Sequence, residues 1–98
     1  MKTVVLTEGT LRYFETEKGF HAEDENGKRL AEIEIRKVPG TENTFDICHT
    51  FVDDALRGRG IAGRLTALAD SRIEKNGGTV QASCSYGQHW LSSHKKDQ

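Results

Sequence analysis

The sequence predicts a single α+β (α/β) domain with a mostly antiparallel sheet, one long helix and a short C-terminal helix. Stretches of alternating apolar and polar residues between residues 19 and 52 indicate strands. Apolar residues then recur at helical spacing from Ile61 onward. A chain of 98 residues is long enough for one core and too short for two lobes. We therefore expect residues 1–98 to form one domain, with a frayed tail at 95–98.

The first half of the chain is typical of an antiparallel meander. Clear strand patterns occupy residues 19–23, 28–37 and 44–52, and weaker apolar runs lie at Val4–Leu6 and Leu11–Phe14. Asn26-Gly27 favours a tight hairpin turn, because both residues tolerate positive φ. Pro39-Gly40 then ends the strand at 28–37. Residues 1–18 are the part of the sheet that the pattern defines least.

Alternation gives the strand at 44–52 two distinct faces. One face carries Phe45, Ile47, His49 and Phe51, and the other carries Cys48, Thr50 and Val52. His49 therefore interrupts an apolar face, and Cys48 points the opposite way and is predicted to be structural.

The second half of the chain predicts a helix at residues 61–76, a strand at 79–84 and a last short helix at 87–94. Ile61, Leu65 and Ala69 form the apolar stripe of the long helix, and Gly77-Gly78 supplies its C-terminal stop. A strand–helix–strand crossover favours parallel pairing of 44–52 with 79–84. Trp90 is expected to pack in the core.

Composition excludes several classes of function. The chain has 14 basic and 15 acidic residues without a basic block, so nucleic-acid binding is not favoured. Its apolar runs are too short for a membrane span or a secretory signal. Cys48 and Cys84 are the only cysteines, and they form neither a disulfide framework nor a metal-ligand pattern. We expect a cytoplasmic protein without a bound metal.

The stretch Leu56–Gly63 is the strongest functional signal. It joins the strand at 44–52 to the long helix. Glycines allow backbone N–H groups to approach an anion closely, and the free N–H groups of a first helical turn point at it. Arg57 and Arg59 add positive charge at the same place. This turn is therefore a candidate phosphate site, because a plain connection needs neither the glycines nor the arginines.

Two nucleotide-binding motifs fit this turn incompletely. The run Gly58–Gly63 matches GxGxxG, but no carboxylate follows at the end of the next strand, at Ala82–Cys84. The chain is also too short for a doubly wound sheet. In a P-loop, Lys-Ser/Thr would stand where Arg64-Leu65 stands, so the loop offers no magnesium ligand.

A third pattern, Arg57-x-x-Gly60-x-Ala62, resembles the acetyl-CoA pyrophosphate signature of the GNAT superfamily of N-acetyltransferases. A subgroup of very small GNAT-like proteins is similar over residues 19–94. The similarity is carried by His49-Thr50-x-Val52, Leu56–Ala62, Cys84-x-Tyr86 and Trp90-Leu91 with His94.

The resemblance implies a minimal GNAT-like fold, in which the parallel pair 44–52 and 79–84 is splayed to admit the pantetheine arm. It also implies an acetyl-CoA-dependent N-acetyltransferase. The implied CoA-binding residues are Phe51, Val52, Arg57, Gly58, Arg59, Gly60, Ile61, Ala62 and Arg64. Backbone amides between Gly58 and Ala62 would hold the pyrophosphate, and Arg64 would reach the adenosine 3′-phosphate.

The resemblance places the thioester near His49 and Cys84. Cys84 has three readings: an acetyl-carrying nucleophile, a proton donor to the CoA thiolate, or a small buried residue. His49 is either a base or orienting group for Cys84, its expected neighbour, or a hydrogen-bonded core histidine. Tyr86 is either a general acid or an amphipathic residue at a sheet edge.

The implied reaction is acetyl transfer to an amine, which must be neutral to attack. No segment of the sequence predicts the N-terminal helix pair that shapes the acceptor pocket in larger relatives. This favours an exposed lysine or a protein N-terminus as acceptor. The alternative is a non-catalytic CoA-binding or interaction module, which would keep the glycine turn and need neither Cys84 nor His49.

Overall fold

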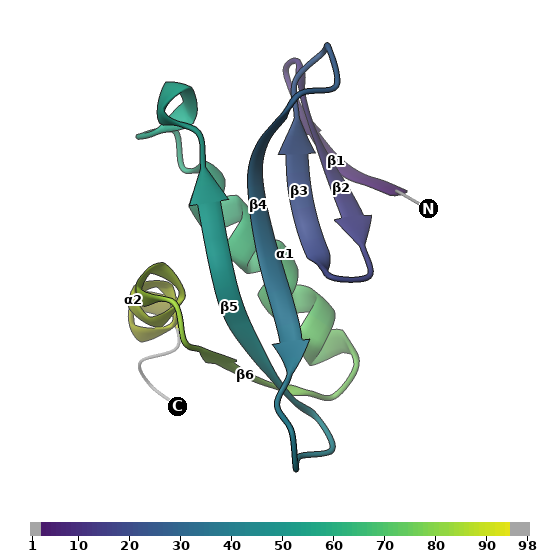
Figure 1. The fold of residues 1–98 in the computed structure, drawn as a ribbon, viewed down its shortest axis with the longest axis vertical. Helices are drawn as coiled ribbons and strands as arrows, with labels where there is room; N and C mark the ends of the chain where they lie inside the picture. Colours follow the sequence, from purple (N-terminus) through teal and green to yellow (C-terminus); the bar gives the residue numbers. More distant parts are fainter. Residues whose placement is uncertain (1–2, 95–98) are drawn as a thin grey trace.

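The computed structural model describes residues 3–94; the predicted frayed tail at 95–98 lies outside them. A six-stranded sheet in the order β1-β2-β3-β4-β5-β6 packs with two helices (Figure 1). The elements are β1 (Thr3–Glu8), β2 (Leu11–Thr16), β3 (Gly19–Glu23), β4 (Arg29–Lys37), β5 (Thr44–Val52), a 3-10 turn (Asp54–Leu56), α1 (Ile61–Lys75), β6 (Thr79–Ala82) and α2 (Ser85–His94). Every neighbouring pair is antiparallel except β5 and β6, which run parallel. The predicted fold class is confirmed.

The core lies between one face of the sheet and α1. Ile61, Leu65 and Ala69 recur every four residues along α1 and are buried against the sheet. Their partners include Ala31 and Ile33, which share one face of β4. Burial of this stripe removes apolar surface from water and holds the helix on the sheet. Trp90 of α2 is buried as predicted.

A β-bulge in β5 changes which side chains face the core. Glu34 of β4 pairs with His49, but the next residue, Ile35, pairs with Ile47, so Cys48 is an extra residue. The inserted residue reverses the alternation beyond it. Ile47 and Thr50 therefore face α1, whereas His49 lies on the opposite face of the sheet. The prediction that His49 shares a face with Ile47 is wrong for this reason.

The parallel strands separate after four residue pairs. Pairing runs from Thr44–Thr79 to Ile47–Ala82, and β5 then continues to Val52 without a partner on that side. The chain beyond Ala82 turns away, while the amides of Ser83 and Cys84 donate to Ile47 O at 3.2 and 3.4 Å. The splayed parallel pair is confirmed. It leaves the outer backbone edge of β5 open beyond the bulge.

The separation also shortens β6 and starts α2 early. β6 ends at Ala82 and α2 begins at Ser85, two residues before the predicted helix start. Cys84 caps the N-terminus of α2, because its carbonyl accepts from Gln88 N at 3.1 Å and its Sγ accepts from Gly87 N at 3.3 Å.

Candidate functional site

The glycine turn forms one wall of a cavity of about 200 Å³. The cavity is lined by Val52 at the end of β5, Leu56, Arg57, Gly58, residues 60–63 and Tyr86 of α2. Elements that are distant in the sequence therefore meet at the start of α1, at the end of the open β5 edge.

The backbone of the turn requires glycine at two positions. Gly58 and Gly60 adopt φ values of 80° and 75°, in the left-handed region that other residues rarely occupy. A side chain at Gly58 would meet no atom within 4 Å, so its Cα borders open space. Gly60 is the residue that caps the N-terminus of α1, and no side chain bonds to the free amides there.

The amides of this turn are available to a ligand. Within residues 3–94, the backbone N–H groups from Gly58 to Gly63 have no hydrogen-bond partner. The first helical bond runs from Arg64 N to Gly60 O at 3.1 Å. These donors lie at the positive end of the α1 dipole, so their chemistry fits a bound anion of the size of a diphosphate.

The three arginines in and next to the turn differ in their contacts. Arg57 Nε lies 2.9 Å from Asp54 Oδ1, and both side chains are exposed. Arg59 forms no ion pair in the described part of the chain and remains available to an anion. Arg64 is turned toward the N-terminal hairpin, where its Nε donates to Glu8.

Glu8 and Tyr13 brace the start of α1 from the hairpin. The hydroxyl of the fully buried Tyr13 donates to Glu8 Oε1 at 2.8 Å, and Glu8 Oε2 accepts from Arg64. Arg64 Nη1 then donates to Gly60 O at 3.1 Å, beside the bond from its own backbone N–H. Two bonds on this carbonyl fix the planar Gly60–Ile61 peptide, so the Ile61 N–H points away from the helix. No local pattern could reveal a pair 56 residues apart.

The structure does not bring His49 and Cys84 together. Cys84 Sγ lies 3.5 Å from Thr50 Oγ1, on the α1 side of the sheet. His49 points to the opposite face, where its Nε2 lies 3.1 Å from Glu32 Oε2. The bulge at Cys48 causes this separation. Glu32 is a residue that the sequence analysis did not single out, because its partner is on another strand.

Tyr86 lies beside the glycine turn and lines the same cavity as Val52, the last residue of β5. Its hydroxyl lies 3.4 Å from the position that a Cβ on Gly63 would occupy, so Gly63 provides the space for it. Burial raises the pKa of Tyr86, which keeps the phenol protonated at neutral pH.

Two further groups lie close to the separation of β5 and β6. Asp46 is buried, and its Oδ2 accepts from Ser83 Oγ at 2.7 Å. Its Oδ1 has no hydrogen-bond partner in the region that the structure describes. Cys48 Sγ lies 3.7 Å from Glu34 O, and burial raises the pKa of its thiol.

Comparisons with known proteins agree with this geometry. A protein-family model described as GCN5-related N-acetyl-transferase matches residues 19–98. The chain belongs to this family. A GCN5-like protein from Staphylococcus aureus, solved by NMR, is 30% identical, with a TM-score of 0.72 over 91% of this chain and 85% of that one. No curated protein matches the sequence significantly.

More distant structures share the fold. A GNAT-family protein from Desulfovibrio desulfuricans is 14% identical with a TM-score of 0.60, over 90% of this chain and 52% of that one. The aminoglycoside N-acetyltransferase AAC(6′)-Iy, solved with CoA, is 20% identical with a TM-score of 0.50, over 95% of this chain and 61% of that one. The chain thus spans little more than half the length of these two proteins.

Family membership establishes the chemistry in outline. As a GCN5-related N-acetyltransferase, the protein is an acyltransferase with acetyl-CoA as co-substrate. The family match begins at residue 19, so β1 and β2 precede it. Neither helix within residues 3–94 is long and apolar enough to cross a membrane.

The Tyr13–Glu8 bond predicts a loss of stability in alkali. Burial, together with the bond to Glu8, raises the pKa of Tyr13 far above its ordinary value of about 10. Above about pH 10 the unfolded chain therefore loses the phenol proton first, and the free energy of unfolding falls as pH rises; below that pH this contribution is complete. Urea unfolding from about pH 8 to about pH 11 measures the slope. Tyr13→Phe should flatten it, and an unchanged slope in this variant contradicts the assignment.

Proposed function

We propose that acetyl-CoA binds with its diphosphate on the amides between Gly58 and Ala62, and that the enzyme transfers the acetyl group to an amine. The observation that supports this most is the set of unpaired backbone donors that line a cavity at the N-terminus of α1. Arg59 neutralises part of the phosphate charge, since it has no other ion-pair partner among residues 3–94. Both cysteines are free, in keeping with the expected cytoplasmic location.

The pantetheine arm pairs with the open edge of β5. Asp53 N donates to the carbonyl of Leu30 in β4 at 2.8 Å, which is the inner side of β5. Because backbone groups alternate sides along a strand, Val52 and Thr50 direct their N–H and C=O groups outward. These groups suit the amides of an extended arm, which takes the place of a missing strand. Phe51, its backbone turned to β4, contributes only its exposed side chain.

The geometry favours direct transfer over a covalent route through Cys84. A nucleophilic thiol needs a neighbouring base or cation, and the contacts of Cys84 Sγ are the hydroxyl of Thr50 and the N–H of Gly87. His49 instead serves as the base that takes a proton from the amine. Tyr86, which burial keeps protonated, is the candidate proton donor to the departing thiolate.

Arg64 is assigned here to the diphosphate site, on which it acts through the backbone, in place of the expected contact with the adenosine 3′-phosphate. Its guanidinium is held by Glu8 and bonds Gly60 O. In this arrangement Arg64 orients the Ile61 amide toward the ligand. Glu8 and Arg64 are thus positioning residues for CoA.

Gly60→Asp should abolish CoA binding, because a carboxylate at this position repels the diphosphate from the amides. Gly60→Asn is the matched control: its Cβ displaces Arg64 Nη1, 2.9 Å away, just as that of Asp does, and Asn tolerates positive φ but carries no charge. Calorimetric titration with CoA compares the two variants with the wild type. Wild-type affinity in Gly60→Asp would place the ligand elsewhere.

Glu8→Gln should weaken CoA binding about three- to tenfold, the equivalent of one ordinary hydrogen bond, because Arg64 loses the negative charge that anchors it. Glu15→Gln is the control, since Glu15 lies 3.5 Å from Arg72 at the other end of α1. Calorimetry with CoA should find the control unchanged. Equal affinities of Glu8→Gln and Glu15→Gln would show that the contact between Glu8 and Arg64 does not act on the CoA site.

Cys84→Ala should retain most of the acetyl transfer, whereas His49→Ala should lower kcat about a hundredfold, the usual contribution of a general base. Intact-mass spectrometry of the wild type with acetyl-CoA should detect no acetyl group on Cys84. An acetylated Cys84 together with an inactive Cys84→Ala variant would establish the covalent route instead.

A further inference from the structure

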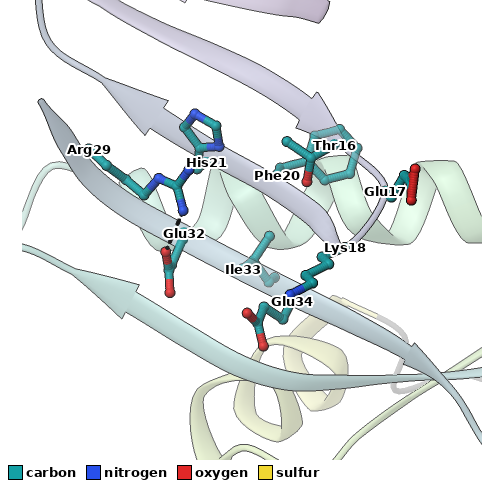
Figure 2. A pocket seen from close by; sticks show the side chains of 9 residues that line it. All are labelled: Thr16, Glu17, Lys18, Phe20, His21, Arg29, Glu32, Ile33 and Glu34. Atoms are coloured by element: carbon teal, nitrogen blue, oxygen red, sulfur yellow. Dashed lines mark hydrogen bonds and ion pairs between the residues drawn. The ribbon is translucent and has the colours of Figure 1, made fainter. Parts of the chain in front are cut away.

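One face of the sheet is open to an acceptor beside the β5 edge. α1 packs against the face that carries Ala31 and Ile33. Glu32 and Glu34 alternate with these residues along β4 and therefore project from the other face. A cavity of about 420 Å³ lies there, between the β2–β3 turn, β3 and β4 (Figure 2). Because α1 does not cover this face, it offers an acceptor a path to a thioester on β5.

Glu32 joins the cavity to His49. It lines the cavity, and its Oε2 lies 3.1 Å from His49 Nε2. An ionised carboxylate only accepts hydrogen bonds, so Nε2 carries the proton of the neutral imidazole. The lone pair is then on Nδ1, and the ring is held in one orientation. Glu32 thus prepares His49 to accept a proton at Nδ1.

We propose that this cavity is the acceptor site, that it takes a primary alkylammonium group on an unbranched aliphatic chain, and that Glu32 is the positioning residue for His49. This inference rests on the proposed function, because it assumes acetyl-CoA on the edge of β5. A free diamine and a lysine side chain carry this same chemistry.

The charges and surfaces around His49 select this substrate class. Glu34 is the direct cross-strand neighbour of His49, so the two Cβ atoms lie about 5 Å apart. Of the two cations that line the cavity, Arg29 is bound to Glu32 at 3.2 Å and Lys18 lies on the β2–β3 turn (Figure 2). An ammonium between Glu32 and Glu34 therefore lies beside His49.

Phe51 and His21 complete the site. Phe51 pairs with Glu32 across the strands and is 45% exposed, which gives the aliphatic chain an apolar surface. His21 lines the cavity and is 2% exposed, stacked on Phe14 and held by Glu23 at 2.7 Å. Its fixed ring is a rigid wall of the cavity.

The transfer balances with these groups. His49 Nδ1 takes one proton from the ammonium and later releases it to water. The neutral amine nitrogen attacks the thioester carbonyl carbon, a carbon–nitrogen bond forms and the carbon–sulfur bond breaks. The second proton of the attacking nitrogen passes to the departing thiolate. The products are the N-acetylated amine, CoA and one proton.

Titrations followed by amide NMR test the site without turnover. With CoA present, butane-1,4-diamine and a lysine tripeptide blocked at both ends are added in separate experiments. We expect the amide signals of Glu32, Glu34 and His49 to shift with one or both probes, and the larger response identifies the source of the amine. No shift there with either probe overturns the proposal. CoA alone should shift the amides of residues 58–63, so failure of the proposed function is recognised separately.

Kinetics with the probe that binds more tightly test the role of Glu32. Glu32→Ala should lower kcat at least tenfold and leave KM for acetyl-CoA unchanged. Glu32→Gln, which still offers an oxygen to Nε2–H, should recover a large part of kcat. Glu42→Ala, an exposed carboxylate in the β4–β5 loop, is the control and should behave as wild type. Equal kcat values for Glu32→Ala and Glu42→Ala overturn the positioning role.

Discussion

Unpaired backbone hydrogen-bonding groups where β5 leads into α1 are the constraint on which the site depends. The strand loses its parallel partner after Ile47. The helix α1 follows Gly60, which has no side chain that could bond to the free amides of the first turn. A segment that leaves both a strand edge and a helix start open offers backbone acceptors and donors to a ligand at one place. In the proposed complex, a diphosphate and an extended amide-containing arm supply the complementary acceptors and donors.

The glycine turn is held in place by residues that precede the segment matched by the family model, which begins at residue 19. Glu8 and Tyr13 belong to the hairpin β1–β2, and they hold Arg64 against the carbonyl of Gly60. Arg72 ties the other end of α1 to the end of β2 and the β2–β3 turn, through the carbonyls of Thr16 at 2.7 Å and Glu17 at 3.0 Å. The helix is therefore fixed at both ends, and the contact at Arg64 is the one that holds the amide orientation at the glycine turn.

The bulge at Cys48 divides the remaining chemistry between the two faces of the sheet. Cys84 lies with Thr50 on the face covered by α1, whereas His49 lies with Glu32 on the open face. The one extra residue of the bulge thus places the thiol and the imidazole on opposite faces of the sheet. It also places the imidazole on the sheet face that α1 does not cover. This separation argues against a Cys–His pair and for a base oriented by a carboxylate.

The sequence alone determined the meander, the long helix, the glycine turn and the family, because hydrophobic periodicity and turn chemistry are local properties of the chain. The splay of β5 and β6 followed from the family resemblance. Tertiary structure alone decided the face of the sheet on which His49 lies, since an inserted residue in a strand leaves no periodic signal. It also decided the pairs Glu8–Arg64 and Glu32–His49, whose members lie 56 and 17 residues apart in the sequence. Contacts between distant segments depend on how the strands align and on which way the bulge turns the chain. These are properties of the packed sheet, which a linear pattern does not contain.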